Sequence, residues 1–250
     1  MTETNPVAGG SRIQVWDGFL RLFHWLLVVA IAVAFLSAEE NSPLNSWHIM
    51  AGWSAAILIA FRLLWGFVGG EYARFSGMFR EGGLGHHIGE MVRLKPAPAV
   101  GHNPLGWISA LLLIAVTAAV IWTGAMIVSS SGEAAEELHE VIGWSLLALV
   151  AVHILAVVVM SVLTRENLIR AMVTGAKPAK HHPEGRDARA PSLFAYLAGF
   201  AVVVAALFGI LRIDPQAFVP RSTESAEYGE HDPGKPYQND DEHEETREDE

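Results

Sequence analysis

The fold is decided by residues 137–163, ELHEVIGWSLLALVAVHILAVVVMSVL. This run is longer than the about 20 apolar residues that a helix needs to cross a bilayer, and it contains His139 and His153. Fourteen residues of helix return a side chain to within roughly 40° of the same face and advance it by roughly 21 Å. One helix therefore presents two imidazoles on one stripe, near opposite leaflets.

Four further stretches have the length and composition of membrane-spanning helices. Half of the chain is hydrophobic (51%), only 18% is charged, and the mean hydropathy is +0.30. The apolar runs are much longer than strands and lack a period of two residues. The sequence therefore predicts an all-α integral membrane fold with spans at 19–36, 47–68, 104–128, 140–163 and 193–211.

Loop charges predict how the spans are oriented. The loops after the first and third spans contain acids but no Lys or Arg. Because positive loops stay in the cytoplasm, we expect a cytoplasmic N-terminus and a C-terminus on the outer side of the membrane. The basic residues of the other two loops are Arg74, Arg80, Arg93 and Lys95, then Arg165, Arg170, Lys177, Lys180, Arg186 and Arg189.

The net charge of −10 is concentrated at the C-terminal end. Residues 213–250 hold thirteen acids and three basic residues, which accounts for the whole net charge. So polar a composition predicts a disordered tail. A merely solvated tail and an acidic docking site for a basic periplasmic partner both remain open.

The chain contains no cysteine. This excludes disulfides, cysteine-ligated iron–sulfur clusters and a haem attached through a C-x-x-C-H motif. Any haem would be held by axial side chains and by packing alone.

Four histidines in the predicted spans form two pairs at matched depths. His48 and His139 open the second and fourth spans near the outer leaflet, whereas His24 and His153 lie toward the inner leaflet. Ionisable groups inside a bilayer are costly and mark functional sites, although a single histidine is as readily a helix–helix hydrogen-bond partner. The pairs His48 with His139 and His24 with His153 predict two non-covalent, bis-histidine haem b groups.

The outer histidines share the motif H-x-x-x-G-W, at 48–53 and 139–144. A glycine four residues after a histidine lies on the same helical face. We expect Gly52 and Gly143 to leave room for a flat macrocycle, although small residues also let helices approach closely.

The inner pair appears at unequal depths if charged residues mark the ends of the helices. Arg21 lies three residues before His24, whereas Arg165 lies twelve residues after His153. We therefore expect the first helix to begin earlier, near residues 13–15. Arg21 would then be drawn inward and pair with a haem propionate; an arginine that extends to the headgroups is the alternative.

The histidines of the predicted cytoplasmic loops are expected to be solvated: His86, His87, His102, His181 and His182. A quinone site near the inner haem that uses His102 and Asn103 is possible, but spacing alone gives it no support.

The chain resembles the bacterial cytochrome b561 family, and within it the b-type cytochrome subunits of nickel–iron hydrogenases. The resemblance covers about residues 13–178. It implies a four-helix core whose two b haems are ligated by the same four histidines, and electron transfer between a redox partner and a quinone or c-type cytochrome. The matching runs are VWD at 15–17, RLFHW at 21–25, FRLLWGF at 61–67, YARF at 72–75, GHNPLG at 101–106, ELHE at 137–140 and RENL at 165–168.

The expected organisation places the haem core before an additional helix. A cytoplasmic N-terminal segment is followed by a four-helix dihaem cytochrome b domain, a cytoplasmic linker, a fifth transmembrane helix and an acidic periplasmic tail. The expected boundaries are 1–12, 13–178, 179–192, 193–211 and 212–250. The fifth helix and the tail depart from the four-helix pattern, so docking to a hydrogenase is not a simple assignment.

These observations and the resemblance predict a dihaem cytochrome of a respiratory chain in a bacterial inner membrane, with its C-terminus in the periplasm. It would carry electrons between the quinone pool and a redox partner, either a hydrogenase-like subunit or a c-type cytochrome. One alternative is a self-contained haem quinone reductase linked to superoxide or ferric iron, so enzymatic activity of the chain alone stays open. The other is a non-haem protein, such as a metal transporter, whose histidines bind metal or brace helices. Nothing in the sequence indicates nucleic-acid binding.

Overall fold

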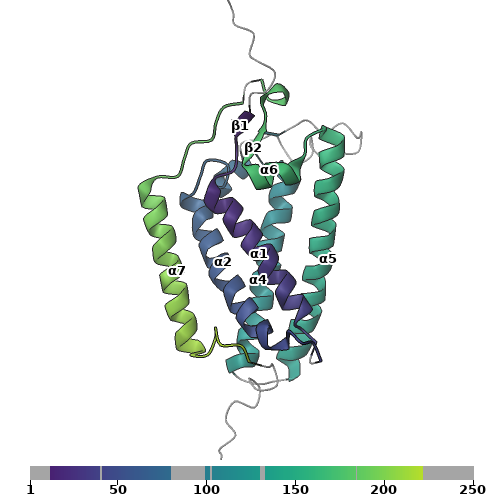
Figure 1. Cartoon of the computed structure of the whole chain (residues 1–250), viewed down its shortest axis with the longest axis vertical. Helices are drawn as coiled ribbons and strands as arrows, with labels where there is room; N and C mark the ends of the chain where they lie inside the picture. Colours follow the sequence, from purple (N-terminus) through teal and green to yellow (C-terminus); the bar gives the residue numbers. More distant parts are fainter. Residues whose placement is uncertain are drawn as a thin grey trace, which may run out of the picture.

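Five long helices run alongside one another in the computed structural model (Figure 1), which describes residues 12–39, 41–79, 99–101, 103–129, 133–183 and 185–221. Each is long and apolar enough to cross a membrane, which confirms the predicted all-α membrane fold. They are α1 (Gly18–Leu36), α2 (His48–Val68), α4 (Pro104–Ser129), α5 (Glu133–Thr164) and α7 (Leu193–Ile213).

The helices pack as two hairpins with one helix added outside. α1 packs on α2 and α4 packs on α5, while α2 also contacts α4 and α7. Trp53 of α2 donates a hydrogen bond from Nε1 to Asp214 Oδ2 at the end of α7, at 2.8 Å. α7 therefore covers the outside of α2 and lies apart from α5.

Short elements close the two ends of the bundle. β1 (Arg12–Gln14) pairs antiparallel with β2 (Ala176–Pro178), with Ile13 opposite Lys177. The strand pair lies beside α6 (Leu168–Thr174), as Figure 1 shows, and is followed by η3 (Ala179–His181). η2 (Phe75–Phe79) follows α2, and η1 (Asn45–Trp47) precedes it at the opposite end.

The expectation that the first helix begins near residues 13–15 is wrong. Residues 12–14 form β1, and Asp17 caps α1 by accepting a hydrogen bond from Leu20 N at 2.8 Å. The inner histidines match in depth for another reason. His153 contacts Ser109, which lies five residues into α4, and His24 lies six residues into α1. α5 continues beyond that level, so Arg165 is not a depth marker.

The start of α5 also differs from the prediction. The helix begins at Glu133 rather than near residue 140, so His139 lies almost two turns inside it. Acids in the first turns of a helix are favoured by its dipole, which explains why Glu136 and Glu137 are accommodated within the helix.

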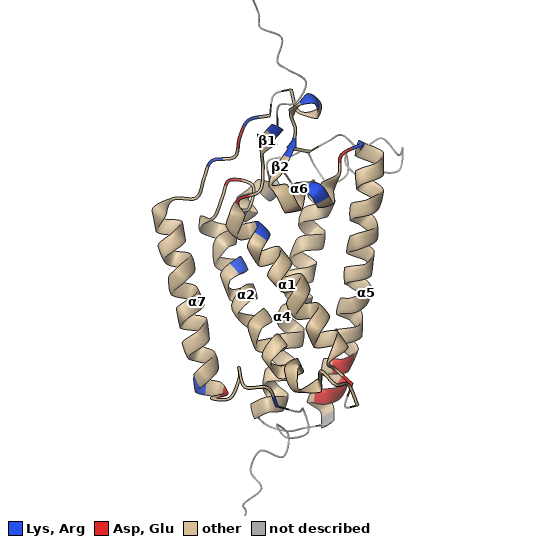
Figure 2. Ribbon diagram, viewed as in Figure 1, with Lys and Arg blue, Asp and Glu red and all other residues tan. Residues whose placement is uncertain are grey.

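The two ends of the molecule differ in charge. Figure 2 shows Lys and Arg gathered around β1, β2 and α6, and acids near the start of α5 at the opposite end. Two described basic residues, Arg212 in the last turn of α7 and Arg221, whose backbone N–H donates to Ser46 O beside η1, lie at that opposite end.

His182 is buried, contrary to the expectation that it is solvated. It is 5% exposed, and its Nε2 lies 2.7 Å from Glu166 Oε1 outside hydrogen-bonding geometry. His181 Nδ1 and Lys177 Nζ lie 3.1 and 3.7 Å from the same carboxylate. These four residues, here called the cap cluster, join β2 and η3 to the end of α5.

The expected disordered tail, apart from its first residues to Arg221, lies outside the described residues, as do His86, His87 and His102.

Candidate functional site

The outer histidines face each other across the bundle. The rings of His48 on α2 and His139 on α5 have centroids 6.1 Å apart, at an interplanar angle of 76°. Two imidazoles bound to one metal from opposite sides, with bonds of about 2.0–2.1 Å, have centroids about 6.4 Å apart. The pair is thus spaced as two axial ligands would be.

Backbone carbonyls fix the tautomers of both outer histidines. His48 Nδ1 lies 2.9 Å from Ala34 O, and His139 Nδ1 lies 3.1 Å from Val120 O. Because a carbonyl only accepts, each Nδ1 carries the proton and each neutral ring keeps its Nε2 lone pair. Metal-bound histidines are oriented in this way by a hydrogen bond from the other ring nitrogen.

The inner histidines pair α5 with α1 instead of α2. His24 on α1 and His153 on α5 are close enough to interact electrostatically. His153 Nδ1 lies 3.2 Å from Ser109 Oγ, whereas His24 Nδ1 is buried without a hydrogen-bond partner. A buried unpaired nitrogen is costly unless a group absent from the protein chain completes it. The structure therefore brings together both predicted pairs.

Two hydroxyls on α4 support the two histidines of α5, and sequence reasoning missed both. Thr123 Oγ1 lies 3.0 Å from His139 Nδ1, as Ser109 lies close to His153. The hydroxyls are fourteen residues apart, the same interval as the histidines, because α4 and α5 run antiparallel in register. That repeated interval was the available signal.

Glycines leave space beside the histidines. A Cβ added to Gly52 or Gly143 would meet no heavy atom within 4 Å. Gly124 on α4 is different, because a Cβ there would lie 3.1 Å from His139 Cε1. Gly124 thus lets α4 approach the ring, while the other two glycines adjoin open space of the kind that a macrocycle requires.

The helices that carry opposing histidines have few residues in close contact with each other. Among the described residues, α5 packs extensively only on α4 and α6, and α1 only on α2 and η1. Leu146 is the one buried side chain among those described on α5. The opposing imidazoles, the orphaned His24 nitrogen and this loose packing together fit a haem at each pair.

Arg21 does not simply extend to the headgroups. Its Nη1 donates to Val173 O near the end of α6 at 2.6 Å, and its Nε is buried without a partner. Arg62 of α2, which sequence reasoning missed as a site residue, is 3% exposed inside a membrane-spanning segment. The inner end of the core therefore contains one half-buried and one buried arginine, each with a buried donor that has no partner.

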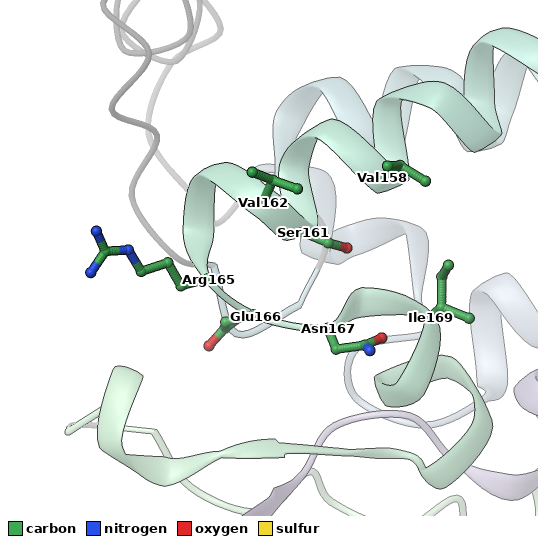
Figure 3. Close-up of a pocket in the computed structure, with 7 residues that line it drawn as sticks. All are labelled: Val158, Ser161, Val162, Arg165, Glu166, Asn167 and Ile169. Atoms are coloured by element: carbon green, nitrogen blue, oxygen red, sulfur yellow. The ribbon is translucent and has the colours of Figure 1, made fainter.

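A pocket of about 420 Å³ lies where α5 meets α6. Figure 3 shows Ser161 and Ile169 facing the space between the helices and Arg165 pointing away. Asn103, considered above for a quinone, instead caps α4 by accepting a hydrogen bond from Gly106 N at 2.6 Å. The pocket is lined by Val158, Ser161, Val162, Arg165, Glu166, Asn167 and Ile169.

Comparison with known proteins identifies the same helices. The sequence profile described as prokaryotic cytochrome b561 matches residues 15–175. The chain is 25% identical over 214 residues to a probable Ni/Fe-hydrogenase B-type cytochrome subunit of Rhizobium leguminosarum bv. viciae, covering 67% of this chain and 89% of the relative. A protein of the same description from Azotobacter vinelandii is 25% identical over 220 residues, covering 66% and 88%.

No solved structure matches the chain. The family match spans α1 to α6 and ends before α7 begins, so the part that carries the four histidines is the part shared with the family. The chain belongs to the prokaryotic cytochrome b561 family and is a membrane b-type cytochrome that functions in electron transfer.

Proposed function

We propose that this cytochrome holds two haem b groups, one between His48 and His139 and one between His24 and His153. The observation that carries the proposal is the 6.1 Å separation of the outer rings, each with its Nδ1 proton directed to a carbonyl. Each haem would be held by two imidazoles, which would suit one-electron transfer rather than oxygen binding.

The chain's own residues would hold and orient both groups. Ser109 and Thr123 set the ring orientation of the α5 histidines, Gly52 and Gly143 leave space beside the outer pair, and Arg21 offers donors to a propionate. The two pairs are separated by roughly 21 Å along α5, so they support a transmembrane relay. The dihaem unit would comprise residues 13–178, with the segment after it placing α7 and the tail.

We further propose that the relay connects the quinone pool of a respiratory chain with a redox partner. The names of the relatives favour a hydrogenase-like partner, with a c-type cytochrome as the alternative. The gathered basic residues in Figure 2 favour a cytoplasmic location for the β1/β2 end in a bacterial inner membrane. The start of the acidic tail would then lie in the periplasm.

Haem content tests the proposal directly. The purified protein should contain two haems per chain and show reduced-minus-oxidised spectra of six-coordinate b haems. His48→Ala should remove the outer haem first and His24→Ala the inner haem first, leaving one haem in each case. A colourless protein, or two haems retained in both variants, would refute the assignment.

A further inference from the structure

Arg62 is a buried cation whose charge is incompletely matched. It is 3% exposed, and its Nη1 is buried without a hydrogen-bond partner. The guanidinium carbon lies 5.0 Å from the centroid of the Phe75 ring, and the side chain is attracted electrostatically to Asp17. Asp17 is already engaged, since its carboxylate accepts hydrogen bonds from Leu20 N and Trp65 Nε1. A cation in this position calls for a further anionic partner.

The register of the α1/α2 hairpin places Arg62 along the bundle. Trp65 is hydrogen-bonded to Asp17 at one end, and His48 to the carbonyl of Ala34 at the other. In antiparallel helices, residues at the same depth have numbers with a constant sum. The sum is 82 for both contacts, so the register does not change between them. The same register puts Arg62 level with residue 20 of α1.

Arg62 is consequently close to the inner histidine in depth. Residue 20 precedes His24 by one turn, roughly 6 Å, toward the β1/β2 end. Arg62 also follows His48 by fourteen residues and so returns to within roughly 40° of the α2 face on which His48 meets His139. It therefore lies toward the interior of the four-helix core. At this depth Arg62 would lie near the edge of an inner haem and not beside its iron.

Other unpaired donors are found at this end of the core. Arg21 and Arg74 each have a buried Nε without a hydrogen-bond partner. Among the described residues of α1, α2, α4 and α5 and the segments joining them, no Lys or Arg lies at the His48/His139 end. Of the described arginines that have a buried unpaired donor, only Arg221 lies at the other end; it follows α7 and is paired with Asp214.

We propose that Arg62 binds the inner haem by pairing its free Nη1 with the propionate carboxylates of that haem. This inference rests on the proposed function, because it requires a haem between His24 and His153. Charge-assisted N–H···O⁻ bonds are stronger than neutral ones, and such a bond satisfies both the buried guanidinium and the carboxylate. The outer haem has no equivalent arginine from the described core.

The test uses the full-length protein in two single-haem backgrounds. Wild type is first checked for two haems, since their absence would refute the proposed function itself. Arg62→Gln and Arg62→Lys are then placed in His48→Ala, which keeps the inner haem, and in His24→Ala, which keeps the outer one. Haem per chain and the midpoint potential at pH 6, 7 and 8 are measured. Arg212→Gln is the matched control, because Arg212 also lies over an aromatic ring, 4.7 Å from the Phe208 centroid, but on α7.

Removing the positive charge should favour the oxidised, more positive haem. In the His48→Ala background we expect Arg62→Gln to lower the potential by about 59 mV at pH 7, a tenfold shift for one electron. The potential should also become more dependent on pH, because the propionate loses its partner and titrates. Arg62→Lys should leave the midpoint potential close to its wild-type value, and Arg212→Gln should leave it unchanged.

Selective effects on the inner haem support the inference, including its loss in Arg62→Gln with retention in Arg62→Lys. Three results would overturn it: an unchanged potential of the inner haem, an equal shift of the potential in both backgrounds, or loss of the haem from both backgrounds in Arg62→Gln and in Arg62→Lys alike. The last result would show that Arg62 only supports the fold through Phe75 and Asp17.

Discussion

At the scale of single residues, the histidines depend on partners that carry no charge. The carbonyls of Ala34 and Val120 determine which nitrogen of the outer rings is protonated, and the hydroxyl of Thr123 adds a second contact to His139. Such outer contacts orient a ligand and raise its affinity for metal. Their contribution can be separated haem by haem, because each α5 histidine has its own hydroxyl.

Ser109→Ala and Thr123→Ala should weaken different haems. We expect Thr123→Ala to loosen the outer haem and Ser109→Ala the inner one, each by about 10-fold to 100-fold in affinity. Transfer of haem to excess apomyoglobin, followed in the two single-haem backgrounds, measures this. Thr117→Ala is the control, because Thr117 on the same helix donates to Leu113 O of its own backbone. Equal effects of all three substitutions would contradict the prediction.

The open space beside Gly52 and Gly143 makes a second residue-scale prediction. Leucine at either position meets no protein atom near its Cβ, so the helices should still form, but the side chain should exclude the outer haem. Haem per chain should fall from two to one while far-ultraviolet circular dichroism stays unchanged. Gly209→Leu is the matched control, since Gly209 on α7 also adjoins open space and should keep both haems.

At the scale of elements, apolar length predicted the helices well, but local signals at their ends were misread. The second and third spans begin and end within one residue of the prediction. The first helix was extended too far because Asp17 directly before an apolar run, a capping signal, was not used. The strand pair escaped prediction because three residues are too few to show alternation, and the paired residues Ile13 and Lys177 are 164 residues apart.

The cap cluster could not be predicted from sequence for a related reason. His182 is buried because the chain after β2 folds back against Glu166, at the end of α5. Burial lowers the pKa of His182 below its usual range, and Lys177 and His181 act in the same direction, whereas Glu166 raises it. The folded cap therefore binds a proton at this ring less readily than the unfolded segment does.

This depressed pKa predicts that acid loosens the cap. As the pH falls below about 6.5, the unfolded His182 takes up a proton that the folded ring resists, so the folded cap loses stability. Limited proteolysis of residues 176–190 should be faster at pH 5.5 than at pH 7.5, after normalisation to an unfolded substrate. His182→Gln should reduce the difference, and His181→Gln, which removes only a small part of the effect on His182, should preserve most of it. Equal pH dependence in wild type and His182→Gln would count against this explanation.

At the scale of the whole molecule, the placement of the four histidines was predictable because depth in a membrane follows from sequence position. Helix rise and alternating direction were enough to pair His48 with His139 and His24 with His153, and the structure brings both pairs together. Which helices lie next to each other in the plane of the membrane could not be predicted in this way. The attachment of α7 to α2 and the burial of Arg62 depend on which faces of the helices meet, and the sequence reasoning used only depth.

Orientation in the membrane is the remaining whole-molecule expectation, and the absence of cysteine makes it easy to test. Asn41 lies in the exposed segment after α1, and Ala190 in the exposed segment before α7, at the opposite end of the bundle. Replacing either with cysteine leaves every charge in place, so the loop charges that determine topology are unaltered. On spheroplasts, a membrane-impermeant maleimide should label Asn41→Cys at once and Ala190→Cys only after the membrane is opened. The reverse pattern would place the β1/β2 end outside, and with it the site at His24, His153 and Arg62. Because both positions are exposed on the protein and lie at opposite ends of the bundle, unequal labelling reports topology rather than access within the protein.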